Sequence, residues 1–202
     1  MKIKILILRH GKTKGNLEGR YIGSKTDESL CAEGIDELEN KKKALNTPTA
    51  LTDENVSVYA SPMKRAVETA ELLFPGSLVH VISNLKEIDF GDFENKNYQE
   101  LNGNSDYQAW IDSGGRNDYP GGEKLDLFIK RSIDGFNEVV SDVTRSNKDS
   151  AAVICHGGNI MAIMSNLTGK DYFDFQVKNG NGYLLELEVE DTEVDLILYS
   201  LI

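Results

Sequence analysis

Residues 2–11 have the sequence KIKILILRHG, in which an apolar run ends abruptly at Arg9, His10 and Gly11. The apolar residues at positions 3, 5, 6, 7 and 8 leave little polar alternation, which predicts a strand over residues 2–8 that is buried on both faces. Because ligands of open α/β sheets bind beyond the carboxyl ends of such strands, the residues that follow position 8 are the first candidates for a functional site.

Further short apolar runs along the chain alternate with helical patterns. Strands are predicted at residues 56–60, 78–82, 151–155, 183–189 and 194–201, the last two as a closing hairpin. Helices are predicted at residues 32–45, 63–74, 124–146 and 160–167. This alternation predicts an α/β fold, a three-layer sandwich with a mostly parallel central sheet and helices on both faces.

Polar residues just before two of these helices are interpreted as caps. Ser61 is the expected N-cap of the helix at 63–74, with Pro62 at the first helical position, where its missing N–H costs nothing. Asn159 is the expected cap of the helix at 160–167. Backbone N–H groups and the positive end of the helix dipole would then point toward the same crevice, which favours an anion.

The chain has the length of one domain. A chain of 202 residues buries about 70% of the surface that its unfolded form exposes, so its core needs no metal or disulfide. Residues 1–202 are therefore interpreted as a single domain. Within it, residues 89–122 are rich in Asn, Gly, Asp and aromatic residues and show weak periodicity. We expect them to form a loop and short-helix insertion that covers the site.

Charge and cysteine content exclude some classes of function. The net charge of −11 argues against nucleic-acid binding, which needs basic stripes. Cys31 and Cys155 form no CxxC pair and are expected to be reduced thiols in a cytoplasmic protein. The apolar start of the chain meets charged residues too soon for a signal peptide or a membrane span. The oligomeric state is left open.

Arg9, His10 and Gly11 form the first candidate site. Arginine presents a planar fork of donors that fits a phosphoryl group, and glycine permits close approach of the backbone at a turn. Asn16 lies six residues after His10 and can donate a hydrogen bond from its side-chain amide to an oxyanion. These residue types after a buried strand predict an anion-binding cradle.

His156 repeats this arrangement after the predicted strand at 151–155. It is followed by Gly157, Gly158 and Asn159 at the start of a helix, and Arg65, near the start of the helix at 63–74, adds another cation. His80, inside the predicted strand at 78–82, has no neighbour that suggests catalysis and is interpreted as a packing residue.

Spacing alone does not identify an acid for this site, nor does it indicate a metal. Glu87 stands among several acidic residues, and Asp89, Asp92 and Glu94 compete with it. No cluster has the spacing of metal ligands, so no metal or other cofactor is expected.

Six short motifs, in this order and spacing, carry a resemblance that spans essentially the whole chain. They are RHGKTKGN (9–16), GRYIG (19–23), SPMKRAVETA (61–70), LKEIDFGDFE (85–94), PGGE (120–123) and CHGGNI (155–160). Together they resemble the histidine phosphatase superfamily, whose fold is that of the phosphoglycerate mutases. The resemblance is greatest to the α-ribazole phosphatase and broad-specificity branch.

The resemblance implies a role for each matching residue. His10 is implied to be the nucleophile that becomes phosphorylated, and Arg9, Arg65 and His156 are implied to complete the phosphate pocket. Glu87 matches the proton donor of the family. The implied substrate contacts are Asn16, Gly23 and Gly157.

The implied activity is hydrolysis of a small phosphomonoester without a metal, with α-ribazole phosphate as a candidate substrate. Cofactor-dependent phosphoglycerate mutases carry a basic insertion, whereas residues 89–122 contain Lys96 and Arg116 as their only basic residues. A mutase and a non-catalytic phosphate-binding module remain as alternatives. Lys12, Cys31 and Met161 depart from the family pattern, which puts in doubt any substrate contact made at position 161.

Overall fold

Six strands form one sheet in the computed structural model, which describes residues 1–45, 56–190 and 193–202. The strands are β1 (Lys2–Arg9), β2 (Ser57–Ala60), β3 (Val79–Val81), β4 (Ser150–Cys155), β5 (Gly182–Glu190) and β6 (Glu193–Leu201). The α-helices are α1 (Lys14–Leu17), α2 (Ala32–Leu45), α3 (Lys64–Leu73), α4 (Ser105–Asp112), α5 (Leu125–Arg145) and α6 (Gly157–Thr168), and the 3₁₀ helices are η1 (Ser83–Leu85), η2 (Gly91–Phe93) and η3 (Tyr172–Phe175). Each predicted strand is present within one or two residues of its predicted bounds.

The strand order in the sheet is β3-β2-β4-β1-β5-β6. The four strands from β3 to β1 run parallel to one another, whereas β5 is antiparallel to β1 and pairs with β6 as a hairpin. The mostly parallel sheet and the closing hairpin are therefore confirmed.

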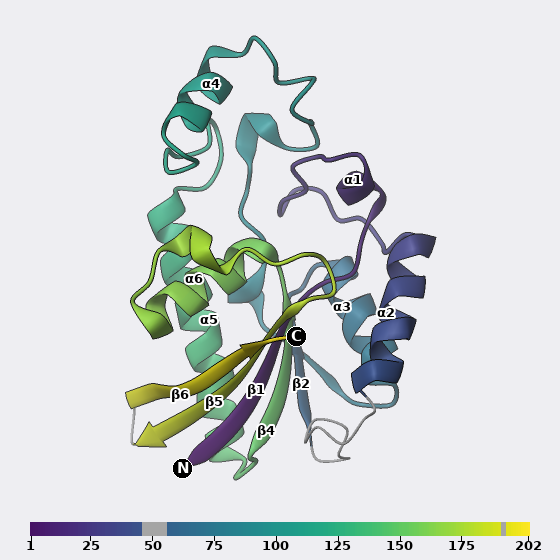
Figure 1. Cartoon of the computed structure of the whole chain (residues 1–202), viewed down its shortest axis with the longest axis vertical. Helices are drawn as coiled ribbons and strands as arrows, with labels where there is room; N and C mark the ends of the chain where they lie inside the picture. Colours follow the sequence, from purple (N-terminus) through teal and green to yellow (C-terminus); the bar gives the residue numbers. More distant parts are fainter. Residues whose placement is uncertain (46–55, 191–192) are drawn as a thin grey trace.

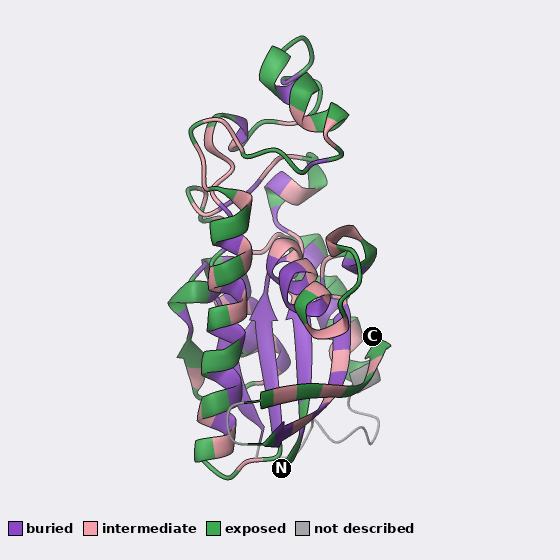
Figure 2. Cartoon of the chain, turned by 90° about the vertical axis from the view of Figure 1, so that its left-hand side faces the viewer, coloured by how far each residue is buried: buried purple, intermediate pink, exposed green. Residues whose placement is uncertain are grey.

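Side chains of β1 alternate between two buried apolar clusters. Ile3, Ile5 and Ile7 pack with α5 and α6, whereas Leu6 and Leu8 pack with α2 and α3. The helix pairs lie on opposite sides of the sheet (Figure 1), and the central strands are buried between them (Figure 2). This alternation explains the continuous apolar run at the start of the chain, since both faces of β1 are covered. The three-layer sandwich is confirmed.

The predicted caps of two helices are wrong. Ser61 does not cap α3, which begins at Lys64 with Met63 as its N-cap. The physical reason is that the N–H of Ser61 still continues the sheet, since it donates to the carbonyl of Ile154 (N to O, 2.9 Å). The N-cap of α6 is His156 rather than Asn159, because the helix begins at Gly157. The side chain of Asn159 still helps to cap α6 from the third helical position, where its Oδ1 accepts from the N–H of His156 at 3.3 Å.

Residues 89–122 contain η2 and α4 and lie beyond the carboxyl ends of the parallel strands (Figure 1). They carry a small aromatic cluster of their own. Its buried members are Phe93, Leu101 and Tyr107, and Tyr21, Phe90, Trp110 and Tyr119 pack against them. Across the described ranges, none of the helices combines the length and apolar character needed to cross a membrane.

Candidate active site

Two histidines follow neighbouring strands of the sheet. Arg9 ends β1 and Cys155 ends β4, and these two residues are register partners. His10 and His156 come next in the chain, and their ring centroids lie 5.0 Å apart in an edge-to-face arrangement. Both side chains are buried. The parallel register thus brings together the two histidines that the sequence places after strands.

The His10 ring is held in one tautomer. Its Nδ1 lies 2.7 Å from the carbonyl oxygen of Gly11, and because a carbonyl can only accept, Nδ1 carries the hydrogen. Burial, and then the charges of Arg65 and Arg9, hold the pKa of His10 well below its usual value. The imidazole is therefore neutral and keeps a lone pair on Nε2, as a nucleophile requires.

Side chains that the sequence did not single out fix the backbone around His10. The N–H of Gly11 donates to Oγ1 of Thr69 at 3.0 Å, and that hydroxyl donates to the carbonyl of Arg65 at 2.6 Å. Asn179 Nδ2 donates to the carbonyl of His10 at 3.1 Å. His10 is thus held to α3 and to the segment before β5 by contacts with no local sequence signal.

The His156 ring is held in place by a contact with Ser61. Its Nε2 lies 2.7 Å from Oγ of Ser61, which also accepts a bond from the N–H of Met63 at 3.3 Å. A hydroxyl can donate to this nitrogen or accept from it, so the contact fixes the position of the ring in either tautomer. Burial first, then nearby positive charge, holds the pKa of His156 well below its usual value. Ser61, predicted as a helix cap, instead orients this histidine.

Two arginines enter the site from different elements. Arg65 is fully buried, and its two terminal nitrogens donate to the carbonyls of Thr26 at 2.9 Å and Gly23 at 3.1 Å. Arg9 donates from Nη1 to the carbonyl of Val177 at 2.9 Å. Burial lowers the pKa of both guanidinium groups. Neither forms a direct ion pair among the described residues, and the carboxyl of Glu87 acts on both charges from a distance.

Buried nitrogens without partners mark the centre of the site. In the described part of the chain four such side-chain nitrogens occur, and three of them are Arg9 Nε, Arg65 Nε and His156 Nδ1. Buried N–H donors are normally satisfied, so the two guanidinium N–H groups call for an acceptor that the protein does not supply. A phosphoryl group has the oxygens and the negative charge to accept from both arginines, whose charges act on His10 and on His156.

Glu87 is the acid that the fold brings to this place. It is buried, and its Oε1 accepts from the N–H of Ile88 at 3.0 Å. Burial raises the pKa of Glu87, against the opposing effects of that N–H and of Arg65 and Arg9. A β-carbon on Gly158 would lie 2.8 Å from Oε1, so the absence of a side chain there permits the close approach. The buried carboxyl thus keeps its proton to a higher pH than an exposed glutamate does.

The acidic competitors of Glu87 are engaged elsewhere or exposed. Asp89 forms an ion pair with Lys25 (Oδ2 to Nζ, 2.9 Å), and Asp92 is exposed. Glu94 accepts hydrogen bonds from two backbone N–H groups. Only tertiary contacts make this distinction, which explains why spacing alone left the four acids equivalent.

The three predicted substrate contacts differ in what they offer. Asn16 Oδ1 accepts from the backbone N–H three residues earlier at 3.1 Å, which leaves its amide hydrogens to donate. A β-carbon on Gly157 would lie 3.6 Å from the guanidinium of Arg9. Gly157 therefore borders the group formed by Arg9, His10, Arg65 and His156, which we call the cradle. Gly23 uses its carbonyl to hold Arg65, and its N–H already donates to Glu94 at 2.9 Å.

Residues that depart from the family pattern turn away from the cradle. Lys12 Nζ lies 2.6 Å from a carboxylate oxygen of each of Glu33 and Glu37 on α2. Met161 packs against the apolar cluster of α5 and α6. His80 is exposed on β3 against a tyrosine ring, which confirms it as a strand residue.

The cysteines and acids offer no metal centre within the described residues. No group of three or more His, Cys, Asp or Glu side chains is placed to hold an ion there. Cys31 and Cys155 are free thiols, and burial raises the pKa of Cys155. A protonated thiol beside His156 is a poor ligand and a poor nucleophile.

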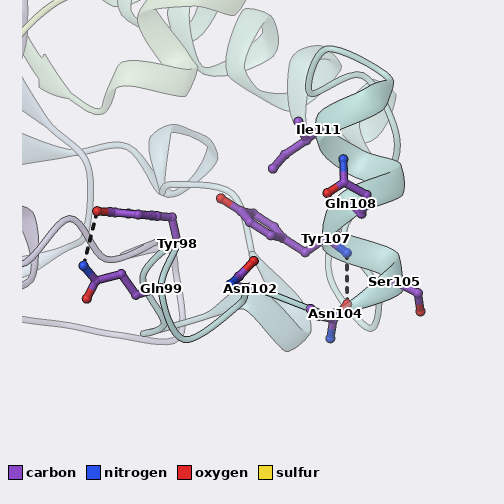
Figure 3. Close-up of a pocket in the computed structure, with 9 residues that line it drawn as sticks. Tyr98, Gln99, Asn102, Asn104, Ser105, Tyr107, Gln108 and Ile111 are labelled. Atoms are coloured by element: carbon purple, nitrogen blue, oxygen red, sulfur yellow. Dashed lines mark hydrogen bonds between the residues drawn. The ribbon is translucent and has the colours of Figure 1, made fainter.

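A separate cavity of about 670 Å³ lies on the insertion (Figure 3). Its lining is uncharged and consists of Tyr98, Gln99, Asn102, Gly103, Asn104, Ser105, Tyr107, Gln108 and Ile111. None of the candidate site residues lines it. The insertion therefore offers neutral polar and aromatic surface, whereas the cradle offers positive charge.

A model of the histidine phosphatase superfamily (branch 1) matches residues 5–201. The chain belongs to this superfamily. It is 27% identical over 194 residues to phosphoserine phosphatase 1 of Hydrogenobacter thermophilus, covering 92% of this chain and 87% of that protein. It is 26% identical over 174 residues to the adenosylcobalamin/α-ribazole phosphatase of Escherichia coli, covering 83% and 80%.

Solved structures share the fold of this superfamily member. The α-ribazole phosphatase of Shigella flexneri has a TM-score of 0.76 at 23% identity and covers 96% of this chain and 94% of its own. A phosphoglycerate mutase from Bacillus anthracis has the same TM-score at 20% identity and covers 96% and 91%. The predicted phosphoglycerate mutase-like α/β fold is confirmed.

Proposed function

We propose that this chain is a phosphatase that hydrolyses a small phosphomonoester through a phosphohistidine at His10, without a metal ion. The proposal is supported by a neutral His10 together with three unpartnered buried nitrogens, Arg9 Nε, Arg65 Nε and His156 Nδ1, in the same buried site. A nucleophile with a ready-made anion cradle is the arrangement that phosphoryl transfer requires.

In the first step, Nε2 of His10 attacks phosphorus in line with the leaving oxygen. The P–O bond breaks, and Glu87 gives its proton to that oxygen, so the alcohol leaves and phosphohistidine remains. Arg9, Arg65 and His156 hold the equatorial oxygens and offset the charge on them. Proton transfer of this kind contributes about 10²–10⁴ to the rate.

In the second step, the Glu87 carboxylate takes a proton from a water molecule that attacks phosphorus. The P–N bond breaks, inorganic phosphate leaves, and His10 returns to its neutral form. The same side chain therefore serves as acid and then as base, for which a raised pKa is favourable.

Water rather than a second phosphoglycerate is the proposed acceptor of the phosphoryl group. The insertion, which we propose covers the site, has two basic residues, and both are engaged. Lys96 Nζ donates to the carbonyl of Asp92 at 2.7 Å, and Arg116 pairs with Asp171 at 2.7 Å. Neither is free to hold the carboxylate of a phosphoglycerate, which supports a phosphatase over a mutase.

The proposed substrate is a small phosphorylated metabolite, with α-ribazole phosphate as the first candidate. The named activity of the Escherichia coli relative supports this choice. The named activity of the Hydrogenobacter relative makes phosphoserine the second compound to test.

The test is hydrolysis of p-nitrophenyl phosphate in the presence of a chelator. We expect turnover in the wild type and loss to background in His10→Ala, because the nucleophile is gone. His80→Ala is the matched control and should retain wild-type activity, since His80 is exposed on β3. Full activity in His10→Ala would overturn the mechanism, and phosphate binding without turnover in the wild type would favour a binding module.

A second assay separates the phosphatase from the mutase. With 3-phosphoglycerate and a 2,3-bisphosphoglycerate primer, release of inorganic phosphate should outpace isomerisation. Turnover dominated by 2-phosphoglycerate would instead establish a mutase.

A further inference from the structure

Arg131, on the second turn of α5, donates hydrogen bonds to the backbone of the segment that carries Glu87. Its Nη1 donates to the carbonyls of Asn84 at 2.8 Å and Lys86 at 2.6 Å, and its Nη2 donates to the carbonyl of Glu87 itself at 3.0 Å. The side chain is only 15% exposed. A single guanidinium thus satisfies three carbonyls of the turn between η1 and the proposed proton donor.

Glu123 holds Arg131 in the orientation that these hydrogen bonds require. Its two carboxylate oxygens accept from Nε and Nη2 of Arg131, each at 2.7 Å, in a bidentate pair. The backbone N–H of Glu123 also donates to the carbonyl of Asp89 at 3.0 Å. Glu123 ends the PGGE motif, to which the proposed mechanism gives no role.

The neighbouring residue on α5 reaches the other side of the site. Ser132 Oγ accepts from Nδ2 of Asn159 at 2.9 Å, and the Oδ1 of Asn159 accepts from the N–H of His156. The same turn of α5 therefore fastens both Glu87 and the start of α6.

We propose that Arg131, held by Glu123, is a positioning residue that fixes the backbone of Glu87 and keeps a compensated positive charge beside it. This inference rests on the proposed function, in which Glu87 is the proton donor. Lysine at position 131 would keep the charge but could not reach three carbonyls and a carboxylate at once.

Removing a charge near Glu87 should shift its pKa in a direction that depends on the sign of that charge. The groups that act on it or are acted on by it are Arg9 from β1, Arg65 from α3, Arg131 from α5, Cys155 from β4, Tyr119 and Tyr172. Neutralising Glu123 would leave Arg131 uncompensated, which favours the carboxylate and lowers the pKa of Glu87. Neutralising Arg131 would remove a positive charge and raise that pKa.

The experiment measures the titration of Glu87 in Glu123→Gln, Arg131→Met and Arg131→Lys. The first readout is the ¹³C shift of the Glu87 carboxyl, assigned by its absence in Glu87→Gln. The second is the high-pH limb of kcat/KM for p-nitrophenyl phosphate, where Glu87 must hold its proton. Arg145→Met is the matched control, because Arg145 lies at the exposed end of the same helix.

We expect opposite shifts for the two neutralising variants. Glu123→Gln should lower the midpoint by about 0.5 pH unit or more, and Arg131→Met should raise it by a similar amount. Arg131→Lys should leave the midpoint of the Glu87 titration near that of the wild type. Its kcat/KM should fall about tenfold, because the hydrogen bonds to the backbone carbonyls around Glu87 are lost. Arg145→Met should change neither quantity.

Shifts in the same direction, or none, would overturn the proposal. If Arg131→Met does not fold, Glu123→Gln still decides it, since a purely structural pair would lower activity without moving the midpoint. An inactive wild type would overturn the proposed function alone, because the carboxyl titration reports on Arg131 and Glu123 without turnover.

Discussion

The cradle at the strand ends and the insertion at residues 89–122 are built in opposite ways. The cradle takes its side chains from β1, α3 and α6, and it is buried and positively charged. The insertion packs aromatic rings on one another and surrounds an uncharged cavity, with Tyr98 64% exposed. The sheet register thus sets the positions of the groups proposed to react, whereas no strand constrains the insertion. We expect the cradle to determine the chemistry and the insertion to determine which leaving group fits.

The largest effect is expected from Arg65→Lys in the cradle. Lysine keeps the charge but loses the buried Nε–H and the fork that holds the carbonyls of Gly23 and Thr26. We predict a fall in kcat of about 10²–10³, the range for removing one donor to developing charge. Thermal unfolding of the same sample shows that it is folded. A loss below about threefold would mean that Arg65 does not face the transferred group.

A smaller and different effect is expected from Trp110→Leu in the insertion. Trp110 stacks on Tyr107 and packs near Tyr119, so leucine should loosen the packing of the aromatic cluster in the insertion. We predict a change of about tenfold in kcat/KM for a bulky phosphomonoester. Inhibition by inorganic phosphate, which would occupy only the cradle, should stay within about twofold of the wild type. Equal changes in both quantities would erase the distinction between the two regions.

The smallest effect is expected from Lys12→Met, two residues after His10. Lys12 points to Glu33 and Glu37 on α2 rather than into the cradle. Exposed ion pairs of this kind contribute little to stability. We predict kcat/KM within about twofold of the wild type and a small drop in the melting temperature. A severe loss of activity would place Lys12 in contact with the substrate.

The sequence predicted what depends on strand ends and failed where contacts cross the fold. His10 and His156 could be found because each follows an apolar strand, and parallel register then places them together. Glu87 could be separated from its acidic neighbours only by the family resemblance of its motif, since its burial comes from other elements. Ser61 was misassigned because its partner, His156, lies 95 residues away.

The supporting residues were missed for the same reason. Asn179 holds the carbonyl of His10 from 169 positions along the chain, and Arg131 holds that of Glu87 from 44. Hydrogen bonds to backbone carbonyls leave no pattern in the sequence of either partner. Motif spacing therefore identifies the groups proposed to react but not those that orient them.

The central claim is that His10 carries the phosphoryl group, and trapping that group tests it most directly. The enzyme is mixed with a phosphomonoester, quenched in alkaline denaturant within one turnover and digested for mass spectrometry. We predict a phosphoryl group on the peptide that contains His10, stable in base and lost in mild acid. A phosphoryl group on another residue, or turnover with no phosphorylated peptide at any quench time, would contradict it.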